Sequence, residues 1–262
     1  MNLSFSKYHG AGNDFILIDD RKGSFPGKDH ETIRRLCDRH TGVGADGLML
    51  LQNSSDKIFH MAYYNSDGYE GTMCGNGGRC IVAFTRELGM VDGLSRVDFS
   101  AVDGDHEAFF IPDGRIALKM KNVNGIRKTG KGYAVDTGSL HHVEYVDKLV
   151  DMDVYRRGKA IRERSSYAPD GCNVNFIHDE KDGTISIRTY ERGVENETLA
   201  CGTGSIAAAI VHHHHGKLRE AYTINALGGT LKVRFEFRGG ERYENIWLEG
   251  PAAFVFKGVW AL

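Results

Sequence analysis

The chain has 262 residues, 41% of them apolar and 26% charged, which excludes a disordered chain and allows a hydrophobic core without covalent staples. Its 33 basic and 35 acidic residues give a net charge of −2, so the charge balance favours neither a nucleic acid nor a membrane surface as a partner. No apolar run reaches the roughly 18 residues that a membrane span needs, and the N-terminus lacks the pattern of a signal peptide. We therefore expect a cytoplasmic protein.

Short strand-like runs recur along the chain, and several of them alternate apolar and polar residues, which favours antiparallel sheets with one wet face. In chain order they are Phe15–Ile18, Leu48–Leu51, Ile116–Met120, Ile185–Arg188, Leu231–Phe237 and Ala253–Phe256. Turn pairs separate them: Asp67-Gly68, Asp113-Gly114, Asn124-Gly125, Asp182-Gly183 and Gly239-Gly240. The sequence thus predicts an α+β protein with many strands and few helices.

Three segments have helical spacing instead. The first is Asp29–Arg39, the second runs from just after Cys74 to Leu88, and the third runs from just after Cys201 to Val211. A Cys-Gly-x-Gly sequence precedes each of the last two, and the two cysteines are 127 residues apart (201 − 74), close to half the chain. This repetition predicts an internal duplication, with domains at residues 1–120 and 121–250 and a final strand, 251–262, that returns to the first domain.

A cysteine immediately before a helix lies where free backbone N–H groups and the helix dipole favour the thiolate. The glycines permit close approach of a ligand, and the same N–H groups can hold a carboxylate. Two such thiols facing one bound molecule could remove a proton from a carbon and return one to its opposite face, without a cofactor. The alternative is that Cys74 and Cys201 are buried structural residues, the role we assign to Cys37, Cys80 and Cys172.

Three other motifs, those of cysteine phosphatases, zinc sites and dinucleotide sites, match the sequence only in part. Cys74 and Arg79 are one residue too close for a cysteine phosphatase loop, and Cys74 and Cys80 do not have zinc spacing. Gly42–Gly47 matches G-x-G-x-x-G, but a helix precedes it and a strand follows, the reverse of a dinucleotide site. We interpret His212–His215 as a solvated helix end, and we expect no metal site.

An ordered set of motifs across essentially the whole chain resembles the diaminopimelate epimerase family. The motifs are Lys7–Phe15, Tyr64–Gly68, Met73–Cys80, Asn173–Phe176, Tyr190–Gly193 and Ala200–Gly204. The resemblance implies two pseudo-symmetric α+β domains, each with mainly antiparallel strands wrapped around a central helix, and an active site in the cleft between them. It implies a cofactor-independent isomerase that interconverts LL- and meso-diaminopimelate in lysine and peptidoglycan precursor synthesis. It also implies a cytoplasmic homodimer.

The resemblance also implies roles for individual residues. Cys74 and Cys201 would be the proton-transfer bases and acids, with His141 and Glu191 tuning the thiols. Because like charges raise a thiol pKa, Glu191 would have to relay a proton or hold the substrate ammonium group. Arg192 would bind the distal carboxylate in a bidentate fork. The remaining substrate-binding positions would be Asn13, Asn65, Gly75, Asn76, Asn173, Gly202 and Thr203.

Three positions, in two motifs, depart from the usual pattern of the family. Gly47 stands where many members have Gln, and Gly138–His141 reads Gly-Ser-Leu-His where they have Gly-Asn-Pro-His. These changes leave open a related cofactor-independent racemase of another amino acid, such as a proline-type or histidine racemase. A third hypothesis is a non-catalytic or redox binding protein, in which one of the two cysteines would be dispensable.

Overall fold

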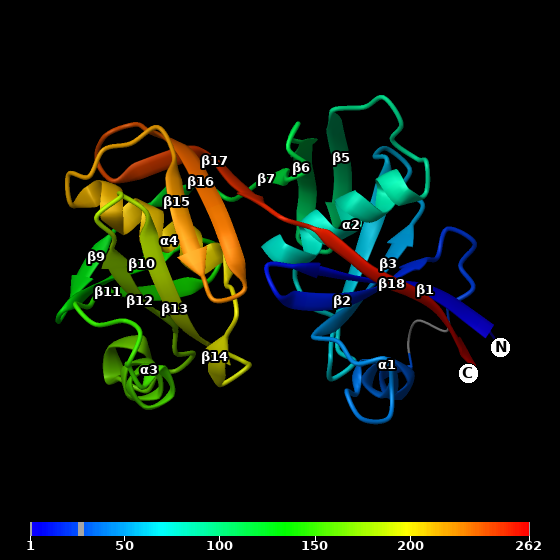
Figure 1. Ribbon diagram of the computed structural model, residues 1–262, viewed down its shortest axis with the longest axis horizontal. Coiled ribbons are helices and arrows are strands. Elements are labelled where there is room, and N and C mark those ends of the chain that lie inside the picture. Colours follow the sequence, from blue (N-terminus) through cyan, green and yellow to red (C-terminus); the bar gives the residue numbers. More distant parts are fainter. Residues whose placement is uncertain (1, 26–28, 262) are drawn as a thin grey trace. The chain divides into compact units, whose positions relative to one another are not determined.

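The computed structural model describes residues 2–25 and 29–261, and the chain divides into two compact units. The first unit comprises Met1–Leu118 and Gly250–Leu262, and the second comprises Lys119–Glu249. Within the described residues each unit has two α-helices and a mixed sheet (Figure 1). The expected α+β class is therefore confirmed.

The first unit is built from eight strands and two helices in the part of the chain that the structure describes. They are β1 (Asn2–Gly10), β2 (Asn13–Asp19), α1 (His30–Cys37), β3 (Gly47–Gln52), β4 (Phe59–Asn65), α2 (Gly75–Glu87), β5 (Arg96–Ala101), β6 (Gly104–Phe110), β7 (Ile116–Lys119) and β18 (Ala253–Ala261). Strand β18 pairs with β1 in antiparallel register, so the last strand of the chain lies beside the first (Figure 1).

The second unit repeats this order of elements. It contains β8 (Val123–Asn124), β9 (Arg127–Thr129), β10 (Gly132–Asp136), β11 (Leu140–Tyr145), α3 (Val154–Arg162), β12 (Asn173–Asp179), β13 (Ile185–Glu191), β14 (Asn196–Thr198), α4 (Gly202–His214), β15 (Tyr222–Ala226), β16 (Gly229–Phe237) and β17 (Arg242–Gly250), with a short 3-10 turn at Ser165–Tyr167.

Strand pairing shows that the two units share one topology. In the first unit β2 pairs in parallel with β3 across α1, and β4 with β5 across α2. In the second unit β11 pairs in parallel with β12 across α3, and β13 with β15 across α4. Phe15 faces Gly47 in the first parallel pair, and His141 faces Asn173 in the second, each 126 residues further along (141 − 15, 173 − 47). The units are therefore pseudo-symmetric, as the duplicated sequence predicts.

The sheets are mixed rather than purely antiparallel. Strand β3 is buried on both faces because helices cover both faces of its sheet, which explains its unbroken apolar run Leu48–Leu51. Three of the expected hairpin turns are correct: Asp113-Gly114, Asp182-Gly183 and Gly239-Gly240 each join antiparallel strands, and their glycines have positive φ.

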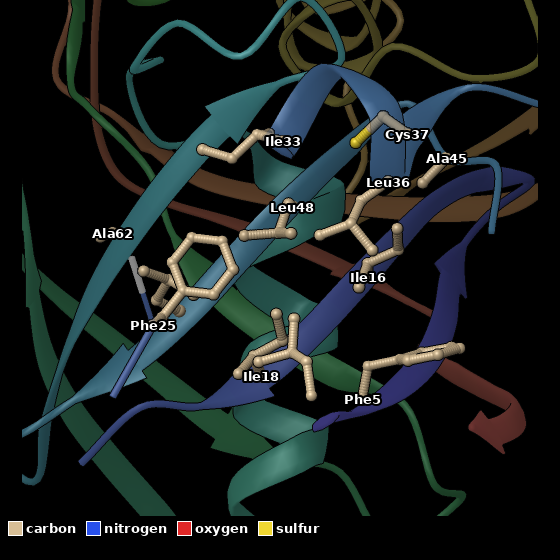
Figure 2. Packing of buried hydrophobic residues seen from close by; sticks show 12 residues of the cluster. Phe5, Ile16, Ile18, Phe25, Ile33, Leu36, Cys37, Ala45, Leu48 and Ala62 are labelled. Carbon is tan, nitrogen blue, oxygen red and sulfur yellow. The ribbon is translucent and has the colours of Figure 1, made fainter. Parts of the chain in front are cut away.

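Helix α1 covers the outer face of the first sheet. Asp29 is its N-cap and accepts a hydrogen bond from the Glu31 backbone, a contact worth about 1 kcal/mol. Ile33 and Leu36 then point at Ile16 and Leu48 of the strands (Figure 2). Each such fully buried side chain contributes about 1.5–3 kcal/mol. This cluster anchors the strands that carry the candidate site residues of the first unit.

Helices α2 and α4 are the central helices of their units, and both begin where the sequence predicts. Nearly every residue of each is buried. The second glycine of each Cys-Gly-x-Gly motif permits this close packing. A Cβ on Gly77 would lie 1.9 Å from Cε of Met49, and one on Gly204 would lie 2.3 Å from Oδ1 of Asn175. These two glycines therefore serve helix–sheet contact, whereas the sequence suggested close approach of a ligand.

Candidate active site

Cys74 is the N-cap of α2 in the first unit. Its backbone is extended, with φ −98° and ψ 132°, and its carbonyl accepts the hydrogen bond from Gly78 N at 2.7 Å that opens the helix. The half-buried thiol donates to Asn13 Oδ1 at 3.7 Å. The sulfur thus lies at the N-terminal end of a buried helix, where the aligned backbone dipoles favour negative charge.

Asn13 is held in one orientation by its own partners. Its Nδ2 donates to the Asp46 carboxylate at 2.6 Å, so its Oδ1 faces Cys74 and accepts from Asn76 Nδ2 at 3.3 Å. Arg39 in turn binds Asp46 at 2.8 Å. Asn13, Cys74, Gly75 and Asn76 therefore lie together at one end of α2.

The backbone hydrogen bonds of Asn65 lie within its own turn rather than with this group. Asn65 is exposed at the C-terminal end of β4, where its backbone bonds to Gly68 and Tyr69. Strand β13 ends at the corresponding place in the second unit, at Glu191. The two residues are 126 positions apart (191 − 65), so they are equivalent in the duplication.

Cys201 is the N-cap of α4 in the second unit, again with extended backbone, φ −113° and ψ 114°. Its carbonyl accepts from Ser205 N at 3.0 Å, and its Sγ lies 3.4 Å from Thr203 Oγ1. Cys201 as a whole is 7% exposed and therefore buried. Thr137 fixes the first turn of the helix by donating to the Thr203 carbonyl at 3.1 Å. Cys201, Gly202 and Thr203 thus form a second helix start of the same type.

His141 is fully buried in β11. Thr189 Oγ1 donates to Asn175 Oδ1 at 3.0 Å, which turns the amide of Asn175 so that its Nδ2 donates to His141 Nδ1 at 3.0 Å. The other ring nitrogen, Nε2, lies 3.1 Å from Ser139 Oγ. These contacts favour the tautomer with the proton on Nε2.

The protonation state of His141 limits its role. Burial, and then the positive charge of Arg192, lower the pKa of His141 to about 3. The imidazole is therefore neutral at physiological pH and supplies no positive charge to a neighbouring thiolate. If it tunes a thiol, it must do so as a hydrogen-bonding or proton-accepting group.

Asn173, Glu191 and Arg192 lie beside His141. The amide oxygen of Asn173 accepts from the backbone N of Arg192 at 2.8 Å, and its Nδ2 lies 3.4 Å from His141 Nε2. Thr198 donates to the partly buried carboxylate of Glu191 at 2.9 Å. The Arg192 side chain is exposed. The second unit therefore brings together the predicted residues His141, Asn173, Glu191 and Arg192.

Of the three departures from the family pattern, Gly47, Ser139 and Leu140, the structure gives reasons for Gly47 and Ser139. A Cβ on Gly47 would lie 2.6 Å from the Tyr63 ring and 2.6 Å from the Tyr64 carbonyl, so the neighbouring strand leaves no room for a side chain there. Ser139 Oγ accepts from Asn173 Nδ2 at 3.2 Å and contacts His141. The Ser139 hydroxyl thus contacts the side chains of both Asn173 and His141.

Cys37, Cys80 and Cys172 are buried, and burial raises the pKa of each thiol to about 12, so they stay protonated. Across residues 2–25 and 29–261 no cysteine forms a disulfide, and no cluster of His, Cys, Asp and Glu side chains is arranged to hold a metal ion. Of the helices in those residues, none is long and apolar enough to cross a membrane.

The interpretation of His212–His215 as a solvated helix end is wrong for its first residue. His212 is fully buried in α4, and its Nδ1 lies 2.9 Å from the hydroxyl of Tyr145. His213 is half-buried against Phe237 and Tyr243, while His214 and His215 are exposed. The helix continues three residues beyond Val211 because its buried face continues into His212.

Sequence reasoning assigned no role to Arg79, Asn175 or Thr189. Arg79 is fully buried in α2 and donates to Asn76 Oδ1 at 2.7 Å. A charged residue directly before the apolar run Cys80–Phe84 of a central helix is a signal that could have pointed to it. No sequence signal distinguishes Asn175 or Thr189 from ordinary strand residues.

Comparison with solved structures identifies the class of fold. A phenazine biosynthesis protein of the PhzF family from Bacillus anthracis superposes with a TM-score of 0.79 at 14% identity, with both chains fully covered. A probable proline racemase from Agrobacterium radiobacter superposes with a TM-score of 0.72 at 16% identity, covering 99% of this chain and 93% of that one. The fold is thus the two-unit fold that these proteins share.

Sequence comparison narrows the class to one family. The diaminopimelate epimerase family model matches residues 5–126 and 133–255. A diaminopimelate epimerase from Flavobacterium psychrophilum is 47% identical over 97% of this chain and 99% of its own length. One from Chlorobaculum tepidum is 43% identical over 95% of this chain and 98% of its own length. The chain belongs to the diaminopimelate epimerase family, and it is an enzyme of the isomerase class.

Proposed function

We propose that the protein interconverts LL- and meso-2,6-diaminopimelate by proton transfer at Cα between two cysteines, without a cofactor. One observation carries this proposal: each unit presents a cysteine at the N-cap of its buried central helix, within the same Cys-Gly-x-Gly motif. One thiolate removes the α-proton, and the other thiol delivers a proton to the opposite face. In this proposal residues of both domains, 1–120 with 251–262 and 121–250, bind one substrate molecule.

An amino acid is a weak carbon acid, so the enzyme must stabilise the charge that develops when the α-proton leaves. The backbone N–H groups of the two helix starts, at Gly75, Asn76, Gly202 and Thr203, bind the α-carboxylate and oppose that charge. Because these dipoles are fixed before the reaction, their effect grows as the transition state is approached. The buried positions of both helices support this role.

The remaining side chains recognise the two ends of the substrate. Arg192 binds the distal carboxylate, and Glu191 holds the substrate ammonium group or relays the thiol proton. Asn13, Asn65 and Asn173 supply neutral donors and acceptors. His141 acts in this scheme as a neutral hydrogen-bonding partner near the thiols. A diamino dicarboxylate satisfies this mixed set of charges better than a monocarboxylic amino acid does.

Solvent isotope labelling tests the chemistry directly. We incubate LL-diaminopimelate with the enzyme in deuterium oxide and analyse the meso product by mass spectrometry. Two-base transfer is expected to place solvent deuterium at the inverted carbon in nearly every product molecule. Substantial carry-over of substrate hydrogen would indicate a single base. Proline and histidine, assayed in parallel, distinguish the alternative racemases, and the absence of Cα–H exchange with every amino acid would favour a non-catalytic protein.

We further propose that the protein is a cytoplasmic homodimer. Strand β18 pairs with β1 along one edge and carries four exposed apolar side chains, Phe254, Val255, Phe256 and Val259. An exposed apolar strand is a ready surface for association with a second copy. Sedimentation at micromolar concentration is expected to give twice the mass of 29.1 kDa, and a Phe254→Lys/Phe256→Lys variant is expected to sediment as a monomer. A monomeric wild-type chain would contradict the proposal.

A further inference from the structure

We propose that Arg79 is a positioning residue that stabilises the thiolate of Cys74 and so makes Cys74 the charged cysteine of the free enzyme. This inference rests on the proposed function in taking Cys74 as a proton-transfer base. It adds a residue to which the family resemblance assigned no role, and it assigns different resting states to the two thiols.

The guanidinium of Arg79 carries a positive charge in the interior of the first unit. Arg79 is fully buried, and it donates from Nη1 to the Gly75 carbonyl at 3.1 Å, from Nη2 to Asn76 Oδ1 at 2.7 Å and from Nε to the Pro251 carbonyl at 3.3 Å. Within residues 2–25 and 29–261 it makes no ion pair with a carboxylate. A buried guanidinium is costly unless a negative charge lies nearby.

A negatively charged group close to Arg79 can balance this charge. Burial lowers the pKa of the Arg79 guanidinium, and negative charge on Cys80 or Cys74 opposes this effect. Burial raises the pKa of Cys80 to about 12, so Cys80 remains a neutral thiol. Asp14, on β2, is already neutralised by Lys7 and Arg39, each at 2.7 Å. Cys74 is therefore the group near Arg79 that can carry the compensating charge.

A chain of hydrogen bonds links the two side chains. Arg79 fixes Asn76, and Asn76 Nδ2 donates to the same Asn13 oxygen that accepts the Cys74 thiol proton. The bond from the thiol to Asn13 favours the protonated form, but at 3.7 Å it is a weak neutral contact. The positive charge of the buried guanidinium acts in the opposite sense and favours the thiolate.

The second unit offers a natural comparison. The residue equivalent to Arg79 in α4 is Ile206, 127 positions further along (206 − 79), and Ile206 is fully buried and uncharged. Both helix starts have the same kind of dipole, and the guanidinium is one difference between them. One thiolate and one thiol in the free enzyme is the state that two-base inversion of one stereoisomer requires.

The test measures the ionisation of each thiol without turnover. Short pulses of iodoacetamide between pH 5.5 and 10, followed by peptide mapping, give a titration midpoint for Cys74 and for Cys201 in the same sample. In the native wild-type protein we expect the midpoint of Cys74 to lie about one pH unit or more below its midpoint in urea and below that of Cys201. An equal or higher native midpoint for Cys74 would overturn the proposal, and this comparison needs no variant.

Variants at Arg79 separate charge from packing. Arg79→Met is expected to raise the Cys74 midpoint by about one unit, which lowers its alkylation rate at pH 7 about tenfold, and to leave Cys201 unchanged. Arg79→Lys, which keeps the charge, is expected to restore most of the shift. Circular dichroism and thermal unfolding check that each variant is folded. Equal shifts in both cysteines, or none, would show that Arg79 has only a structural role. Because no substrate is used, this result is independent of whether the protein epimerises diaminopimelate.

Discussion

Cys201→Ala is expected to lower the rate of epimerisation by about 10³-fold, because a positioned general acid–base group contributes about 10²–10⁴-fold. The fold should be retained, since alanine is smaller than cysteine and the Cys201 side chain makes no cap hydrogen bond to its helix. The variant keeps Cys74, so it should still exchange the α-hydrogen of one stereoisomer with solvent. Chiral chromatography measures the loss of inversion, and mass spectrometry in deuterium oxide measures the exchange.

Cys74→Ala is the complementary variant, in which Cys201 is the remaining thiol of the pair. It should lose inversion to a similar extent but exchange the opposite stereoisomer, because the remaining thiol approaches the other face of the carbon. Cys37→Ala is the matched control, since Cys37 is buried behind the first sheet and has no role in the proposed chemistry. If Cys201→Ala retained turnover, or if both single variants exchanged the same stereoisomer, the two-base scheme would be wrong.

Arg192→Met is expected to reduce kcat/KM for diaminopimelate about 10- to 100-fold, mostly through KM. The side chain is exposed, so no buried contact is lost, and the cost is that of a charge-assisted hydrogen bond to the distal carboxylate, about 1.5–3 kcal/mol. Steady-state kinetics with both stereoisomers measure this loss. Arg192→Lys should recover only part of the activity, because an ammonium group lacks the bidentate fork.

The matched control for Arg192 is Arg96→Met. Arg96 is an exposed arginine whose bonds to Asp98 lie on the surface of the other unit, where such ion pairs contribute about 0–1 kcal/mol. Its kinetics should match those of the wild type. Unchanged KM in Arg192→Met would remove Arg192 from substrate recognition and reopen the question of which amino acid the enzyme takes.

Local sequence patterns predicted three of the four helices in the described residues. Helix α1 has apolar residues at helical spacing, and α2 and α4 are runs that follow the two Cys-Gly-x-Gly motifs. They missed α3, whose nine residues include four basic side chains and Gly158. A glycine inside a helix normally counts against it. Here it is required by packing, since a Cβ on Gly158 would lie 2.4 Å from Cβ of Tyr190 on β13. That contact joins residues 32 positions apart (190 − 158), which no local window contains.

The parallel strand pairs could not be read from the sequence for a similar reason. The alternation of apolar and polar residues along a strand predicts which face of the strand is exposed to solvent. It does not predict which other strand pairs with it. The pairing of β2 with β3 and of β11 with β12 depends on the helices that cross between them. Only the tertiary structure therefore showed that the sheets are mixed and covered on both faces.

The sequence by itself determined the two helix-capping cysteines, the duplication and the family, because these depend on residue types at fixed spacing along one chain. The tertiary structure decided which side chains are buried and which groups surround them. It placed His141 in a neutral, fully buried state, it buried His212, and it enclosed the Arg79 guanidinium at the end of α2 that carries Cys74. The physical reason is that desolvation and hydrogen-bond partners come from strands distant in sequence, and these set the charge that each group can carry.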